Sequence, residues 1–183
     1  GVARVLGLPN ERFRPDNPGG FEAYEAEYQA AAVRAQRHLG LRPGDQMPAL
    51  NLLAISGGGE NGAFGAGLLN GWTSTGALTA PFAFLGPAWD DKLKAVYTDI
   101  SPERVAVRRW FTAAIWDDAL ADTAPLFATI SAMLDEAMLA AIAKGYEEGR
   151  LLMVGSDDID AQVPVIWNLG AIAASGHPRA LDT

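Results

Sequence analysis

The chain has 183 residues, and its composition, with 49% hydrophobic and 20% charged residues, is that of an ordinary globular domain with one sizeable core. Its net charge of -8 argues against binding to nucleic acid, which depends on basic residues that neutralise phosphates, and it provides no attraction to anionic membranes. The absence of cysteine excludes disulfides, thiolate metal sites and a Cys nucleophile. The sequence predicts neither a secretory signal nor a membrane-spanning segment.

The sequence pattern of the N-terminal quarter of the chain predicts an arm followed by one helix. Residues 1–20 are rich in Pro, Gly and Arg without any period, which predicts an extended arm. From Phe21 to Leu39, aromatic residues and alanines recur at helical spacing, and Gly40 can terminate that helix. Prolines and a glycine then mark 41–48 as a loop. We therefore expect two parts, the arm and helix in 1–48 and an α/β domain in 49–183.

The apolar run Leu50–Ser56 stops at three glycines, which is typical of a buried strand in a parallel sheet. Helices are expected after it, from Glu60 to Trp72 and from about Thr75 onward. Two more are predicted over 90–97 and 102–116, where Pro102 suits a first helical turn.

The C-terminal third combines a long apolar stripe with two short strands. Apolar residues from Leu126 to Ile142 recur at helical spacing, and strands are predicted over 151–155 and 163–168, with the acidic stretch 156–162 as the loop between them. Helices that alternate with apolar strands indicate an α/β fold, with helices on the faces of a mainly parallel sheet.

The segment Ile55–Gly65 carries the strongest chemical signal in the sequence. A glycine run between a strand and a helix exposes backbone N–H groups at a helix N-terminus, where they and the helix dipole stabilise negative charge. The anion can be a nucleotide phosphate, a free phosphate or the oxyanion of a tetrahedral acyl intermediate. The residues that would supply these donors are Gly57, Gly58, Gly59 and Gly62.

The spacing of Gly57, Gly59 and Gly62 also matches the dinucleotide-binding fingerprint. That site needs an acidic residue about 20 positions further on to hold a ribose hydroxyl, and no charged residue occurs between Glu60 and Asp90. No Gly-Lys-Ser/Thr follows, so a P-loop is not supported either. The oxyanion interpretation is favoured over nucleotide binding and over a purely structural glycine turn.

An oxyanion loop needs a nucleophile, and Ser74 is the candidate. It precedes Thr75-Gly76 at the expected start of an apolar helix, where a Ser on a sharp turn exposes its hydroxyl. Taken alone, Ser74 is better explained as a helix N-cap, for which Ser is a favoured residue. The glycine run a short distance before it makes the nucleophile the preferred interpretation.

Several segments, spread over most of the chain from about Leu8, resemble bacterial patatin-like phospholipases. They are Ala54–Gly67, which resembles the oxyanion loop of the family, Ser74–Phe84, which resembles the second half of its Gly-x-Ser-x-Gly elbow, and the stretches Asp118–Leu126 and Val165–Ser175. The resemblance implies a three-layer α/β/α patatin-like fold with a mainly parallel central sheet, incomplete in these residues. It also implies a Ser–Asp dyad that hydrolyses acyl esters of phospholipids or other lipids, without a cofactor.

The sequence departs from the family at three places. Trp72 stands where the elbow has its first glycine, and Gly67 and Ser74 leave no room for the strand that should lead into the elbow, as if about a dozen residues were missing. Asn61 stands where the family often has Lys or Arg. No Asp-Gly pair occurs, so the Asp of the dyad is expected outside these 183 residues.

The remaining polar residues offer weaker candidates. His38 is expected on the surface of the first helix, and His177, in a Gly-His-Pro turn, is a minor candidate for a catalytic base. The aspartates at 157, 158 and 160 are expected in a solvated loop, and no metal site is predicted. The favoured function is a lipid acyl hydrolase that acts on a lipid or acyl-ester substrate, and a peripheral contact of the protein with a membrane is compatible with it. The alternative is a non-catalytic patatin-like protein that binds a lipid or a partner.

Overall fold

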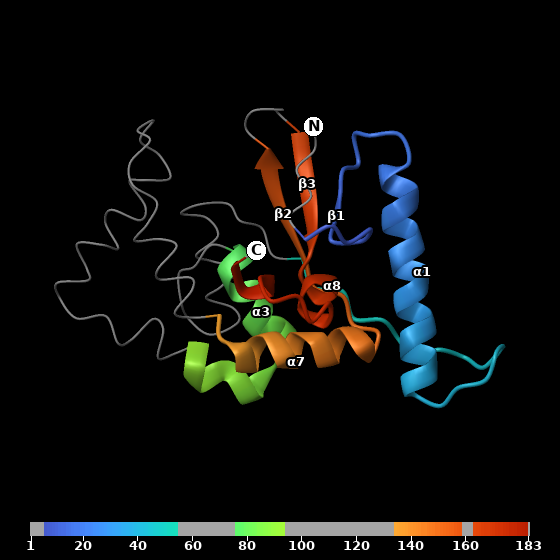
Figure 1. Cartoon of the computed structure of the whole chain (residues 1–183). Coiled ribbons are helices and arrows are strands. Elements are labelled where there is room, and N and C mark those ends of the chain that lie inside the picture. Colours follow the sequence, from blue (N-terminus) through green and yellow to red (C-terminus); the bar gives the residue numbers. More distant parts are fainter. Residues whose placement is uncertain (1–5, 55–75, 94–133, 159–162, 183) are drawn as a thin grey trace, which may run out of the picture. The chain divides into compact units, whose positions relative to one another are not determined.

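The computed structural model describes residues 6–54, 76–93, 134–158 and 163–182 (Figure 1). The chain separates into two compact units. Unit 1 combines Gly1–Ala54 with Glu136–Thr183, and unit 2 comprises Ile55–Asp135. The N-terminal arm and helix therefore share a unit with the C-terminal strands, while the expected boundary after residue 48 stays a prediction.

Helix α1 of unit 1 spans Gly20–His38, which confirms the helix expected from Phe21 to Leu39. It ends as the sequence predicts, because Gly40 adopts a φ of 67° that favours glycine. The amide of Gly40 donates to the carbonyl of Arg37 over 3.1 Å, and the amide of Leu41 donates to that of Gln36 over 3.0 Å. These two bonds satisfy carbonyls that the last turn would otherwise leave without partners.

The described sheet contains strands β1 (Arg12–Phe13), β2 (Met153–Asp158) and β3 (Val163–Asn168), in the order β1-β3-β2. Both pairings are antiparallel, with Phe13 opposite Ile166 on one side of β3 and Gly155 opposite Ile166 on the other. Strands β2 and β3 confirm the two strands predicted near the C-terminus, while β2 continues to Asp158 through residues that were expected in a loop.

The mixed α/β class is confirmed, but the described sheet is antiparallel rather than mainly parallel. Residues 159–162 alone connect β2 to β3, whereas a parallel connection needs about a dozen residues or more. The predicted strand Leu50–Ser56 was also wrong over its described part. Residues 50–54 form no strand, and Leu52 is 86% exposed, because no described strand lies beside this segment to accept its hydrogen bonds.

Helices α7 (Glu136–Glu147) and α8 (Leu169–Ala174) pack together and supply much of the core of unit 1. The buried residues of α7 recur at helical spacing and are Met138, Ile142, Gly145 and Tyr146. The helix begins later than the apolar stripe expected from Leu126 onward, since Leu134 lies in a bend; residues 126–133 fall outside the described part. Asn168 caps α8, because its side-chain oxygen accepts the amide of Ala171 over 3.1 Å.

Unit 2 is described over helix α3 (Gly76–Leu85), the short 3-10 helix η2 (Pro87–Trp89) and the helical residues 90–93. Helix α3 confirms the apolar helix expected from about Thr75, although it contains Pro81. The helices expected over 60–72 and 102–116 lie outside the described residues. A second 3-10 helix, η3 (Ala180–Asp182), belongs to unit 1.

Gly149 ends α7 at a point where this helix closely approaches α1. It has a φ of 91°, and a Cβ added there would collide with the backbone of Ala31 and Ala35. We expect Gly149→Ala to lower the free energy of unfolding by about 2 kcal/mol, because it combines backbone strain with overpacking. The measurement is urea unfolding followed by circular dichroism.

Gly155→Ala is the matched control, since no atom lies within 4 Å of a Cβ added at Gly155. This substitution should change the free energy of unfolding by less than about 0.5 kcal/mol. Equal stability of the two variants would contradict the close approach of α7 and α1 at Gly149.

Candidate functional site

The residues of the predicted catalytic site lie outside the described part of the chain. These are the nucleophile candidate Ser74 and the oxyanion-loop residues Gly57, Gly58, Gly59 and Gly62. The described chain reaches Ala54 before the glycine loop and resumes at Gly76, where helix α3 begins two residues after Ser74. The meeting of the glycine loop and the Ser74 hydroxyl in space therefore stays a prediction, and so does the absence of about a dozen residues between Gly67 and Ser74.

The two histidines occupy the kinds of position that the sequence predicts. His38 is exposed at the C-terminal end of α1. His177 lies in the turn between α8 and η3, where its amide donates to the Ser175 hydroxyl over 3.1 Å. Its Nδ1 accepts the amide of Arg179 over 3.1 Å. This second bond orients the imidazole within its own turn.

The aspartates expected in a strand-to-strand loop are placed differently. Asp157 and Asp158 belong to β2 and pair with Pro164 and Val163 of β3, while Asp160 falls outside the described residues. The expectation of a loop was wrong for these two because the short connection lets the hairpin ladder continue to Asp158.

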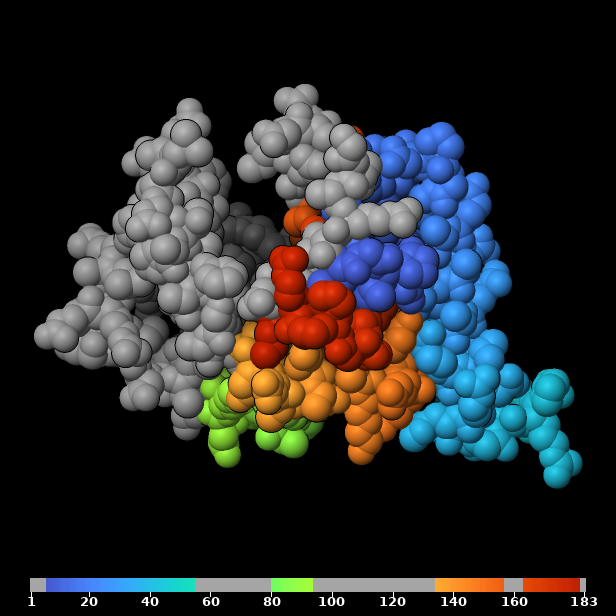
Figure 2. Space-filling model, viewed as in Figure 1, coloured from blue at the N-terminus to red at the C-terminus, as the bar shows by residue number. Residues whose placement is uncertain are grey.

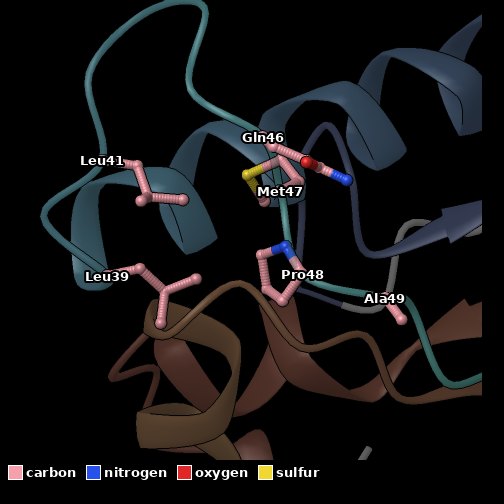
Figure 3. A pocket seen from close by; sticks show the side chains of 6 residues that line it. All are labelled: Leu39, Leu41, Gln46, Met47, Pro48 and Ala49. Atoms are coloured by element: carbon pink, nitrogen blue, oxygen red, sulfur yellow. The ribbon is translucent and has the colours of Figure 1, made fainter.

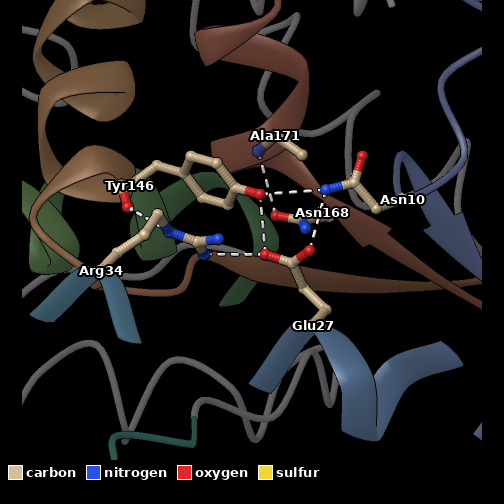
Figure 4. A network of polar contacts seen from close by, with 6 residues as sticks. All are labelled: Asn10, Glu27, Arg34, Tyr146, Asn168 and Ala171. Carbon is tan, nitrogen blue, oxygen red and sulfur yellow. Dashed lines mark hydrogen bonds and ion pairs between the residues drawn. The ribbon is translucent and has the colours of Figure 1, made fainter. Parts of the chain in front are cut away.

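A buried polar cluster joins the arm, α1 and α7 (Figure 4). We call it the Glu27 cluster; its members are Asn10, Glu27, Arg34 and Tyr146. Glu27 is 6% exposed, and one oxygen of its carboxylate accepts the Tyr146 hydroxyl over 2.7 Å and the Arg34 guanidinium over 2.8 Å. The other oxygen accepts the amide of Asn10 over 2.8 Å. Both oxygens of a buried carboxylate thus have hydrogen-bond donors.

Arg34 also ties the cluster to the backbone of α7. Its Nε donates to the carbonyl oxygen of Tyr146 over 2.9 Å, and the guanidinium carbon lies 3.8 Å from the centre of the Tyr146 ring. Hydrogen bonding and a cation–π contact therefore hold the same guanidinium in place. The arrangement fixes the angle at which α7 meets α1.

The electrostatics of the cluster suit an anchor rather than an acid–base pair. Burial raises the pKa of Glu27, but hydrogen bonds from Asn10, Tyr146 and Arg34 and the charge of Arg34 outweigh it, so the pKa lies below the ordinary value of 4.5. Burial, together with the hydrogen bond to Glu27 and its negative charge, raises the pKa of Tyr146 from 10.0 to about 12. Neither group changes its protonation near neutral pH, where a general acid or base must do so.

The sequence carries one signal for this cluster, although aromatic and alanine spacing alone does not reveal it. Glu27, Ala31 and Arg34 fall on one face of α1, since residues at i, i+4 and i+7 share a face. Opposite charges on the same face as a buried alanine indicate an inward-facing pair. Their partner Tyr146 lies 119 residues away in sequence, and no local pattern identifies it.

Ionisation of Tyr146 should destabilise the protein at high pH. Its pKa in the folded state lies above the ordinary value of 10.0, so its contribution is fully present below pH 10 and is lost as the pH rises to about 12. We expect the stability difference between wild type and Tyr146→Phe to shrink over this range, as measured by urea unfolding at several pH values. A difference that stays constant would contradict the raised pKa.

An open groove of about 470 Å³ lies between the end of α1 and the loop that follows it (Figure 3). Its lining residues are Leu39, Leu41, Gln46, Met47, Pro48 and Ala49. The loop is folded on itself, because the carboxylate of Asp45 accepts the amide of Arg42 over 2.7 Å. With Gln46 as the one polar side chain in this lining, the groove favours contact with apolar groups over catalysis.

Within the described ranges, no group of His, Asp and Glu is arranged to hold a metal ion. None of the described helices combines the length and apolar character needed to cross a membrane. Comparison with protein-family models, with curated proteins and with solved structures found no match to this chain in any of the three.

Proposed function

We propose that this chain is the N-terminal part of a patatin-like lipid acyl hydrolase. In this proposal its complete fold has three α/β/α layers around a mainly parallel sheet. Ser74 attacks the ester carbonyl of a lipid, and the backbone N–H groups of the Gly57–Gly59 loop, chiefly those of Gly58 and Gly59, stabilise the oxyanion. The Asp of the dyad takes the hydroxyl proton, and water hydrolyses the acyl-enzyme.

One observation carries the proposal: a glycine-rich segment and a serine that precedes a helix occur in the order that the proposed acyl transfer requires. The loop Gly57–Gly59 follows an apolar run, and Ser74 precedes helix α3 by two residues. A serine just before a helix matches the turn-to-helix part of the setting in which nucleophile elbows present their hydroxyl, while the strand that leads into such an elbow has no room between Gly67 and Ser74. The apolar character of α3, with Phe82 buried, supports an interior helix behind such a turn.

The proposal requires no metal or cofactor, since the dyad supplies the nucleophile and the base, and the backbone N–H groups stabilise the oxyanion. In this proposal the proton passes directly from the Ser74 hydroxyl to a carboxylate, since His177 is the one candidate base among the two histidines of these 183 residues. His177 already accepts a hydrogen bond from Arg179 through Nδ1, which favours the dyad over a triad.

A fluorophosphonate probe tests the proposal, because it reacts only with an activated serine. We expect labelling of the protein that includes the dyad Asp, at Ser74, with the adduct located by peptide mass spectrometry. Ser156→Ala is a matched control, since Ser156 is exposed on β2 and its hydroxyl accepts the Trp167 indole N–H over 2.8 Å. Folded protein that takes up no probe would favour the non-catalytic alternative, a patatin-like protein that binds lipid without turnover.

A further inference from the structure

Residues 46–54 form an exposed connection that follows helix α1 and its turn, and we call this segment the linker. Unit 1 continues to Ala54 and unit 2 begins at the next residue, so the linker ends at the boundary between the two units in sequence. Every residue of the linker is exposed, and none belongs to a helix or a strand. Figure 2 shows part of the chain after α1, in cyan, projecting from unit 1 into solvent. The linker is therefore accessible to another macromolecule.

The backbone of the linker is open to another chain. Among the described residues, no amide or carbonyl of 46–54 is hydrogen-bonded to another backbone group. A partner that binds main-chain groups therefore has no existing hydrogen bonds to break here. The active site of a protease is such a partner, because it binds the backbone of its substrate and accepts one side chain in a specificity pocket.

The linker also offers side chains that fit an apolar specificity pocket. Leu50 is 69% exposed, Leu52 is 86% exposed and Leu53 is 59% exposed. No charged residue occurs between Asp45 and Glu60, so no charge next to these leucines has to be desolvated when one of them enters the pocket. The chemistry of the linker therefore favours a protease that cleaves after large apolar residues.

Exposed apolar side chains also occur on α1, but there the backbone is protected. Tyr28 is 44% exposed, and an apolar pocket accepts its ring as well as it accepts leucine. It lies in the middle of the hydrogen-bonded helix Gly20–His38, so cleavage after Tyr28 requires local unfolding first. The linker requires no such opening, because its backbone is already unpaired. Access to the backbone thus distinguishes the linker from α1.

The contacts that hold unit 1 together lie on either side of the linker. Strand β1 pairs with β3, and the amide of Asn168 donates to the carbonyl of Glu11 over 2.9 Å. The Tyr146 hydroxyl donates to Glu27 over 2.7 Å. Each of these contacts joins the piece before the linker to the C-terminal piece, and none includes a linker residue. A cut in the linker therefore leaves all of them in place.

We propose that the linker is a processing site, where an endoprotease with an apolar specificity pocket cleaves after one of the three leucines and unit 1 remains assembled as two fragments. Water adds across the scissile C–N bond, so the leucine gains a carboxylate and the residue after it gains an amine. The cut removes the covalent connection between the N-terminal piece of unit 1 and unit 2. This inference does not depend on the proposed hydrolase activity.

Limited digestion with chymotrypsin tests where the chain is cut. At a low extent of digestion, we expect the bonds after Leu50, Leu52 or Leu53 to be cleaved at least about tenfold faster than the bond after Tyr28, because only the latter requires the helix to open. Peptide mass spectrometry assigns and quantifies each cut. Cleavage after Tyr28 that is as fast as cleavage of the linker would overturn the proposal.

A variant without the leucines tests the assigned specificity. Leu50→Gln, Leu52→Gln and Leu53→Gln together should lower cleavage of the linker at least about tenfold, because glutamine fills an apolar pocket poorly. All three leucines are more than half exposed, so the circular dichroism spectrum should stay that of wild type. Val33→Gln is the matched control, since it removes an apolar side chain that is 52% exposed on α1 and should leave linker cleavage unchanged. Equal linker cleavage in both variants would overturn the proposal.

A single cut at a defined bond tests whether unit 1 stays assembled. The protein carries the recognition sequence of a highly specific protease in place of residues 49–54, and we expect the cut protein to elute from a size-exclusion column with the mass of the uncut chain. Glu27→Ala should raise the dissociation constant of the two fragments at least about 100-fold, whereas Glu25→Ala, at an exposed position, should change it less than about threefold. Fragments that separate without denaturant in the absence of either substitution would overturn the proposal.

Discussion

Ser74→Ala is expected to lower kcat/KM for a p-nitrophenyl ester by about 10³ or more, because no other group can then form the acyl-enzyme. The measurement uses the protein that includes the dyad Asp and follows release of p-nitrophenolate. The backbone donors remain in this variant, so binding of the ester should change less than turnover does.

The control for this experiment is Ser156→Ala, which also removes one hydroxyl but leaves the predicted site untouched. Its kcat/KM should stay close to that of wild type. Turnover that survives in Ser74→Ala would remove Ser74 from the mechanism and leave the glycine loop with a structural or binding role.

Glu27→Ala is expected to lower the free energy of unfolding by about 4 kcal/mol, because it leaves the Arg34 charge without its partner in a buried setting. The side chain of Arg34 is 18% exposed and that of Glu27 is 6% exposed. Water therefore solvates the Arg34 guanidinium poorly once the carboxylate has been removed. Asn10 and the Tyr146 hydroxyl lose an acceptor in the same substitution. Urea unfolding at neutral pH measures the effect.

Glu25→Ala is the matched control for Glu27→Ala. Glu25 lies on the same helix but is exposed, so its loss should change the free energy of unfolding by less than about 0.5 kcal/mol. A Glu27 variant as stable as the Glu25 variant would contradict the anchoring role of the Glu27 cluster.

The sequence predicted local elements well where one segment carried all the information. Helix α1 and its end at Gly40 follow from the spacing of apolar residues and from one glycine that can adopt a positive φ. Strand β3 follows in the same way from a short apolar run. In each case a pattern within about twenty residues is enough to predict the element.

The arrangement of the strands was harder to predict because it depends on connections and on partners. Composition alone predicts a strand over Leu50–Ser56, yet a strand also needs a neighbour, and none of the described strands pairs with residues 50–54. The connection between β2 and β3 is too short for a parallel pair, so its length indicates that β3 runs antiparallel to β2. The spacing of apolar residues contains no information on this direction. The predicted site at Ser74 and Gly57–Gly59 stays a prediction.

The division of unit 1 into two pieces of sequence has a consequence for synthesis on the ribosome. Glu27 leaves the exit tunnel long before its partner Tyr146, which is 119 residues further along the chain. During that interval the Glu27 carboxylate and Arg34 lack the contacts with Tyr146 and must remain hydrated on that side of the helix. The N-terminal piece of unit 1 therefore completes its packing only after the C-terminal piece has been synthesised. A chain stalled before α7 should be a preferred target for chaperones and proteases.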